Sequence, residues 1–509
     1  MNMDKSLYEI ILQNIEDGKL SDSFKLPDEP NEIGVPFADG AMDGITVYHM
    51  GRSGIDASGT KQMIKAIKFA AAGNAIEADN AFAELGKSFR AISIIDELQN
   101  YIIKHSSKLH AGNVHQTAKQ LVLCSRNRES VKYGLSILEL FTAIDEQTKE
   151  VIRRIGLSDE FTIFAVWNML RWENANDEVF RLIQNVHGWG RIHALERLEA
   201  DTPEIRKWMI AEGIQNNVMP AYSALTVWQK ANVSEFIRGT ISKEEFSAVG
   251  QIISGLLDEG PVPGISEIEN AEDVLSEYLM KAAEFDLDID DYETIFEINV
   301  WASDEDVDLP NLIEECMEIL SSQACEETIR EAVKDGSGLR LASALDVDYA
   351  DDLLACLRKD FDGHYHQSSH LMALDGYVGQ VLDLFRENLP LEQMHKDPEN
   401  ELGLGPGFEP YNKLEVIVQE LGSYPNTGED LIVAGLWSPV TRSRNMALRA
   451  LETWTKALQS PISNISEHIY RELQSLYAKE PNVEVRERIQ KLIDGIIADD
   501  ADEEEYEGE

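Results

Sequence analysis

The chain has 509 residues and a formal net charge of −47, because 92 Asp and Glu residues outnumber 45 Lys and Arg residues. This charge repels phosphate backbones and anionic lipids, so we expect no nucleic-acid and no membrane partner, whereas basic proteins, cations and neutral small molecules remain candidates. No apolar run has the length of a membrane span and the acidic, amphipathic N-terminus differs from a signal peptide, so the sequence predicts a cytoplasmic protein.

The first 60 residues predict an N-terminal helix followed by an irregular segment. The irregular part, KLPDEPNEIGVPFADGAMDG, is rich in Pro, Gly and Asp, which are turn-forming residues. The next six residues, ITVYHM, predict either a short strand or an extended connection.

Residues 61–115 predict consecutive amphipathic helices with a break near Gly73-Asn74. The small residues of this stretch resemble those of a tetratricopeptide-type helical hairpin, over about one repeat unit. They are Ala70, Ala72, Ala78 and Ala81, with Gly86 following Leu85.

Residues 116–260 contain the clearest repeat of the sequence. The segments VKYGLSILELF, EFTIFAVWNML, WGRIHALERLE and MPAYSALTVWQ align with small or apolar residues at intervals of 30, 29 and 30 residues. Two helices per period of about 30 residues are typical of an α-solenoid, because one hairpin cannot bury its apolar face alone. The aligned residues are Leu135, Ala165, Ala194 and Ala224, and we expect Trp167, Trp189 and Trp228 to fill gaps between layers.

The stretch NVHGWGRIHALERLE, residues 185–199, permits a catalytic interpretation, since His187 and His193 flank Arg191. A structural interpretation competes with it. The pattern Arg191-x-x-Ala-x-x-x-Leu returns in degenerate form at Arg444 and Arg486, and it resembles the second helix of HEAT repeats. That resemblance implies that each arginine reaches an acidic residue of a neighbouring unit. We therefore expect GWG to be a turn between helices and His193 to belong to the following helix.

The C-terminal half continues as helices with less regular spacing. Residues 261–398 predict an acidic helical region, and 399–412 a Gly/Pro-rich linker loop. Residues 413–497 predict further HEAT-like helices, and the acidic tail 498–509 predicts disorder.

Four cysteines are present without any Cys-x-x-Cys pair, and each lies among apolar residues at helical spacing. This pattern predicts buried free thiols in a reducing compartment. The residues are Cys124, Cys316, Cys325 and Cys356.

Residues 286–297, DLDIDDYETIFE, offer a candidate calcium site. Asp286, Asp288, Asp290 and Glu297 occupy positions 1, 3, 5 and 12 of an EF-hand loop. The sixth position, which favours glycine, is Asp291. Acidic residues that cap and open a helix are the alternative explanation.

The densest histidine cluster, DGHYHQSSHLMALDG, offers a candidate metal site at His364, His366 and His370. The spacing matches no established zinc or iron motif, and a helix N-terminus with exposed polar residues explains the pattern equally well.

Whole phrases of the N-terminal half resemble bacterial proteins named limonene hydroxylase. The phrases are ADGAMDGITVYHMG, RAISIIDELQNYII, GLSDEFTIF, VHGWGRIHALERLE and LLDEGPVPGISEIENAE. They cover most of residues 1–275. The resemblance implies a monooxygenase that hydroxylates a cyclic monoterpene with NAD(P)H or a flavin as donor, but it supplies no catalytic residue. The sequence itself shows no phosphate loop or dinucleotide fingerprint, and a fold does not provide an oxidant.

The sequence therefore predicts an all-α protein, a HEAT/TPR-like α-solenoid. Its first expected function is an interaction scaffold that presents a concave surface to a protein partner, for which the charge favours a basic protein. The alternatives are limonene hydroxylation and a metal-dependent activity at the histidine cluster.

Overall fold

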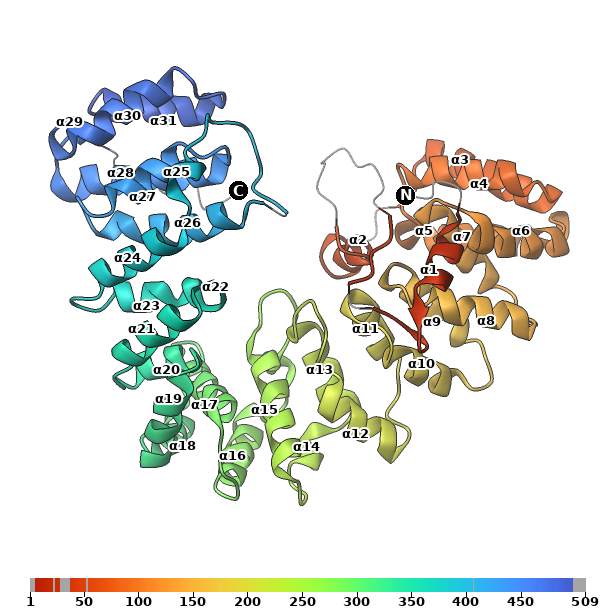
Figure 1. Cartoon of the computed structure of the whole chain (residues 1–509). Coiled ribbons are helices and arrows are strands. Elements are labelled where there is room, and N and C mark those ends of the chain that lie inside the picture. Colours follow the sequence, from red (N-terminus) through yellow and green to blue (C-terminus); the bar gives the residue numbers. More distant parts are fainter. Residues whose placement is uncertain (1–4, 22, 28–36, 52–53, 406, 498–509) are drawn as a thin grey trace. The chain divides into compact units, whose positions relative to one another are not determined.

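The computed structural model describes residues 5–21, 23–27, 37–51, 54–405 and 407–497 (Figure 1). Within these ranges the helices and strands are α-, 3-10 or π-helical except for one small hairpin. Its two strands have two residues each, β1 (Ile15–Glu16) and β2 (Lys19–Leu20). The predicted all-α class is therefore confirmed. None of the described helices combines the length and the apolar character needed to cross a bilayer.

The chain divides into two compact units. Unit 1 comprises Met1–Leu287 and Thr294–Met317, and unit 2 comprises Asp288–Glu293 and Glu318–Glu509. The predicted acidic tail, 498–509, lies outside the described residues.

Unit 1 begins with six helices and a π-helix. They are α1 (Leu7–Gln13), α2 (Ala41–Ile45), the π-helix η1 (Thr46–Met50), α3 (Ala57–Ala72), α4 (Ala75–Gly86), α5 (Ala91–Lys104) and α6 (Ala111–Cys124), with a 3-10 turn η2 (Ser106–Lys108). The helical hairpin α3–α4 forms as expected, because Gly73 ends α3 with φ of 82° in the left-handed region. The expectation of a strand or extended connection for ITVYHM is wrong, since Ile45 ends α2 and residues 46–50 continue it as a π-helix.

The repeat region of unit 1 forms a series of stacked helices. They are α7 (Arg128–Leu138), α8 (Glu146–Ile155), α9 (Asp159–Met169), α10 (Ala175–Ile183), α11 (Gly188–Leu195), α12 (Pro203–Glu212), α13 (Ala221–Lys230), α14 (Val233–Phe236), α15 (Lys243–Leu257), the 3-10 turn η3 (Ile265–Glu267) and α16 (Ala271–Ala282). Helix α7 packs on α9, α9 on α11, α11 on α13 and α13 on α15. The four aligned positions have no exposed surface; they are Leu135, Ala165, Ala194 and Ala224.

The boundaries of two helices in this region show how local sequence determines where a helix begins. Thr202 caps α12 through its side chain, and Pro203 is the first helical residue. The GWG stretch is not a turn between helices, because α11 begins at Gly188 and includes it. His193 does belong to this helix and is buried.

Unit 2 is also helical, and two helices lead into it. Helices α17 (Ile289–Ala302) and α18 (Pro310–Leu320) contain residues of both units. The following elements are α19 (Gln323–Val333), α20 (Leu339–Ala344), α21 (Ala350–Lys359), α22 (Phe361–His364), η4 (Tyr365–Gln367), α23 (Ser368–Met372), α24 (Val378–Asn388), α25 (Leu391–Met394), α26 (Glu409–Glu420), η5 (Leu421–Ser423), α27 (Glu429–Leu436), α28 (Thr441–Leu458), α29 (Ile462–Ile465), α30 (Glu467–Tyr477) and α31 (Val483–Ile493).

Helix α28 is central to the C-terminal part of unit 2, where it packs against α26, α27 and α31. Its Trp454 is fully buried and donates a hydrogen bond from Nε1 to the carbonyl of Leu421 at 2.6 Å. The predicted linker loop ends earlier than expected, because residues 409–412 form the first turn of α26.

The four cysteines are free thiols. Three are buried, as predicted, but Cys124 is exposed at the end of α6.

Candidate functional site

Arg191 forms contacts between neighbouring helices. Arg191 donates from Nη2 to the carbonyl of Glu212 at 2.7 Å, and the same nitrogen lies 3.7 Å from the Glu212 carboxylate. Its guanidinium also lies over the ring of Trp208. Both partners belong to α12, so Arg191 joins α11 to the next helix of the stack.

The two glycines of GWG are explained by Asp159, the first residue of α9. A Cβ on Gly188 would lie 2.5 Å from Asp159 Oδ2, and one on Gly190 would lie 2.4 Å from Oδ1. The carboxyl group thus occupies the N-terminus of α11, where backbone N–H groups of His187 and Gly190 donate to it. Burial nevertheless raises the pKa of Asp159 well above its usual value.

Trp189 holds a segment from much earlier in the chain, Asp39–Met50, which we call the clamp segment. A Cβ on Gly44 would lie 2.1 Å from the Trp189 ring, so only glycine permits this approach. Ala41, Trp189 and Ile192 form a small buried apolar cluster, against which Tyr222 also packs. The clamp segment therefore lies on the helices of the repeat stack.

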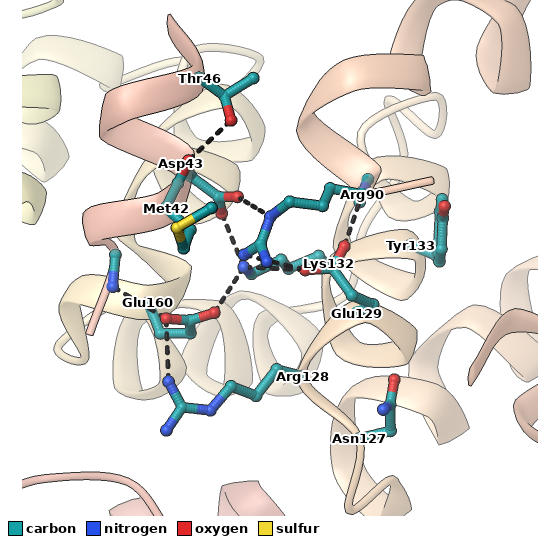
Figure 2. A network of polar contacts seen from close by, with 12 residues as sticks. Met42, Asp43, Thr46, Arg90, Asn127, Arg128, Glu129, Lys132, Tyr133 and Glu160 are labelled. Carbon is teal, nitrogen blue, oxygen red and sulfur yellow. Dashed lines mark hydrogen bonds and ion pairs between the residues drawn. The ribbon is translucent and has the colours of Figure 1, made fainter. Parts of the chain in front are cut away.

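A buried charge network lies beneath the clamp segment (Figure 2). Its centre is Lys132 of α7, whose side chain has no exposed surface. The Nζ atom lies 2.7 Å from Asp43 Oδ2, 2.5 Å from Glu160 Oε1 and 3.2 Å from Glu129 Oε1. Three carboxylates from three different parts of the chain thus surround one ammonium group.

Two arginines extend the network. Arg90 Nε lies 3.2 Å from Asp43 Oδ1, and Arg128 Nη1 lies 2.8 Å from Asp39 Oδ1 and 3.1 Å from Glu160 Oε2. The backbone N–H of Gly40 also donates to Glu160 Oε2 at 2.8 Å. The clamp segment therefore contributes two carboxylates and one N–H group to the network.

The charges of the network set the pKa values of its members. Burial raises the pKa of Glu129, whereas Lys132 and Arg90 act against this effect. Burial would also raise the pKa of Glu160, but Lys132 and Arg128 lower it to about 2. Lys132 keeps its proton, because the surrounding carboxylates raise its pKa despite burial.

The C-terminal end of the clamp segment adds polar contacts through two aromatic residues. The hydroxyl of Tyr48 donates to Glu196, which also pairs with Arg197. His49 Nε2 and the Tyr222 hydroxyl are 2.7 Å apart. Burial would raise the pKa of Glu196, but the neighbouring His193 ring, the hydrogen bond from Tyr48 and the charge of Arg197 lower it to about 2.

The predicted histidine site is not assembled as a metal site. His364 lies at the end of α22, His366 in the turn η4 and His370 in α23. His366 is exposed, while burial lowers the pKa of His370. Among the residues that the structure describes, no three His, Cys, Asp or Glu side chains are grouped so that they could hold a metal ion.

The predicted calcium loop has a helical backbone over most of its length, since α17 begins at Ile289. Asp288 and Asp291 exchange backbone-to-carboxylate hydrogen bonds of 3.0 and 3.1 Å, which is the geometry of a capping box. Asp290 and Glu297 lie within the helix, so the loop that would gather them with Asp286 is not formed. The structure thus agrees with the capping explanation.

Sequence patterns gave no indication of the charge network. Asp43, Glu129, Lys132 and Glu160 lie in three separate stretches, and their spacing matches no motif. The only available signal was the pair of glycines in DGAMDG, Gly40 and Gly44, which we attributed to a loop.

Comparison with known proteins gives no relative for this chain: no protein-family model matches it, and no curated protein sequence matches it. The resemblance to proteins named limonene hydroxylase therefore gains no support from these comparisons, and the conclusions about function must come from the structure.

Proposed function

We propose that this protein is a HEAT-like helical-repeat scaffold that binds a basic protein partner. The observation that carries the proposal is the continuous stack of α7, α9, α11, α13 and α15, in which each helix packs on the next. Helical repeats joined in this way expose an extended surface, and such surfaces commonly bind other proteins.

The contacts of the repeated arginines support the same architecture. Arg191 reaches Glu212 of α12, and Arg444 of α28 forms an ion pair of 2.8 Å with Glu480, which follows α30. Arg486 donates to the carbonyl of the same Glu480. Arg191 and Arg444 thus pair with glutamates outside their own helices, whereas Arg486 bonds only to the backbone of the segment that directly precedes its helix.

The charge of the chain supports a basic partner. The net charge is −47, and the cations of the buried network already have carboxylate partners. The field outside the protein therefore attracts positively charged surfaces and accelerates their association, with a strength that falls as salt rises.

A pull-down followed by a binding measurement tests the proposal. Tagged protein is incubated with cell extract at about 0.15 M and about 1 M NaCl, where screening differs several-fold. We expect a defined basic protein at the lower salt only, and it should rebind when both proteins are purified. Failure to recover any protein that rebinds would contradict the scaffold function.

Two charge variants of equal net charge locate the surface. One neutralises exposed acids of the repeat stack: Glu173→Gln, Asp177→Asn, Asp201→Asn and Glu204→Gln. The matched control neutralises exposed acids elsewhere: Glu314→Gln, Glu318→Gln, Asp346→Asn and Asp352→Asn. Weaker binding by the first variant alone would assign the contact to the stack, whereas equal effects would indicate attraction by net charge only.

Limonene hydroxylation stays a prediction of the sequence resemblance. No observation on the described residues favours it, so we do not propose it as the function. Oxidation of limonene by the purified protein with NADH would be the direct measurement.

A further inference from the structure

We propose that the clamp segment is a detachable intramolecular ligand, which occupies a cationic site formed by α7 and the start of α5 that binds an acidic peptide when the segment undocks. This inference concerns a site other than the acidic surface discussed above and does not depend on the scaffold function. It rests on what holds the segment in place and on the charges that would remain without it.

The clamp segment is held mainly by polar contacts at its two ends. Near its start are the ion pairs of Asp39 and Asp43 and the N–H group of Gly40; near its end are the hydrogen bonds of Tyr48 and His49. Its contacts with the small buried apolar cluster come from Ala41, Ile45 and Tyr48. The Tyr48 ring also lies against the rings of Trp189 and Tyr222. A segment held by so few apolar side chains can open locally while the helices beneath it stay folded.

Undocking would change the charge balance of the network. Without the clamp segment, the network consists of residues from α7, α9 and the start of α5. These elements supply three cations but only two carboxylates: Arg90, Arg128 and Lys132, against Glu129 and Glu160. The clamp segment adds Asp39 and Asp43. Without it, one positive charge is in excess on a protein that is otherwise strongly acidic, and a buried cation without a partner is costly.

The segment itself shows which ligand the site accepts. Its carboxylates are four residues apart, Asp39 before α2 and Asp43 within it, and Gly44 follows directly so that the chain can pass close to Trp189. A peptide of the form Asp-x-x-x-Asp-Gly reproduces these groups. Covalent attachment gives the clamp segment a high effective concentration, so a separate peptide binds well only when the segment is weakened.

Hydrogen–deuterium exchange of the unmodified protein tests whether the segment opens by itself. We expect residues 40–50 to exchange through openings that leave 159–169 and 188–195 protected. If all three stretches exchange at one common rate, the segment is part of the folding core and the proposal is wrong.

Gly44→Ala tests whether the vacated site binds a peptide. The added Cβ meets the Trp189 ring and should displace the segment without altering the cations. The probe is a fluorescent peptide with the sequence of residues 37–50, FADGAMDGITVYHM. We expect the peptide to bind Gly44→Ala at least about tenfold more tightly than it binds the unmodified protein, because the competing segment no longer occupies the site.

Two controls make the result specific. Gly54→Ala adds a Cβ where no atom lies within 4 Å, so this variant should bind the peptide as weakly as the unmodified protein. A peptide with Asp39→Asn and Asp43→Asn should bind Gly44→Ala about tenfold less tightly, since it lacks the charge-assisted contacts. Equal binding of the peptide to both glycine variants, equal binding of both peptides to Gly44→Ala, or loss of protection in α9 and α11 of Gly44→Ala would each overturn the proposal.

Discussion

Lys132 is a lysine without exposed surface that lies within 3.2 Å of three carboxylates, from Asp43, Glu129 and Glu160. An ammonium ion in this position is tolerated because three carboxylates surround it. The buried carboxylates, in turn, depend on Lys132 and on the adjacent arginines for their opposite charge. A substitution of Lys132 should therefore have a large effect on stability.

Lys132→Met should lower the free energy of unfolding by about 3–5 kcal/mol, because it leaves buried carboxylates without their cation. Urea denaturation monitored by circular dichroism measures this change. Lys68→Met, at an exposed lysine of α3, is the control and should change stability by about 0.5 kcal/mol or less. Equal stability of the two variants would mean that the network tolerates the loss of its central charge.

Glu196 predicts a pH dependence. Its pKa is lowered from 4.5 to about 2 in the folded state, so its ionised form stabilises the fold. This contribution is fully present above pH 4.5 and is lost as the pH falls towards 2. Glu196→Gln should therefore lose stability at neutral pH and show a flatter stability profile between these pH values. Urea denaturation across that range measures the profile, with Glu204→Gln at an exposed site of α12 as the control. Identical profiles for Glu196→Gln and the unmodified protein would contradict this role.

At the scale of elements, arginines join helices that are distant in sequence. Arg444 is fully buried in α28, where it donates to the carbonyl of Ser438 at 2.8 Å and to Glu480 Oε1 at 3.0 Å. Glu480 in turn has no exposed side-chain surface. The pair fixes the end of α30 against α28, which explains why a long charged side chain stands in an apolar helix face.

Arg444→Met should lower the free energy of unfolding by about 3–5 kcal/mol, since Glu480 would then be buried without its cation. Arg449→Met, at an exposed position of the same helix, provides the comparison. The measurement is again urea denaturation. A loss of stability of similar size in both variants would show that the helix, and not the buried pair, determines the effect.

At the scale of the whole molecule, the chain forms two compact units. Lys132 belongs to unit 1, and Arg444 belongs to unit 2. Where each unit has its own core, a destabilising substitution acts mainly on the unit that contains it, and unfolding need not follow a single two-state transition.

Hydrogen–deuterium exchange should therefore separate the two substitutions. Lys132→Met is expected to increase exchange in α7, α9 and α11, and Arg444→Met in α26, α28 and α30, with the other unit unchanged in each case. The control is the unmodified protein under the same conditions. Increased exchange throughout the chain in either variant would indicate that the two units unfold together.

The sequence determined the elements of this protein: helices with a repeat of about 30 residues, the break at Gly73 and the burial of the four aligned positions. Such features depend on neighbours three or four residues away, which a single sequence displays. The resemblance of their patterns to HEAT repeats also implied that Arg191 and Arg444 would bond outside their own helices.

Only the tertiary structure decided how the site is built. The sequence assigned the region around Gly44 to a loop and ITVYHM to a short strand or an extended connection, whereas the fold places this segment against α7, α9 and α11. Asp43 and Glu160 meet at Lys132 although more than a hundred residues separate them in the chain, and Asp159 explains the glycines of GWG. Contacts of this kind produce no repeating pattern in the sequence, because ion pairs and close approaches at glycine depend on distances in space and not on spacing along the chain.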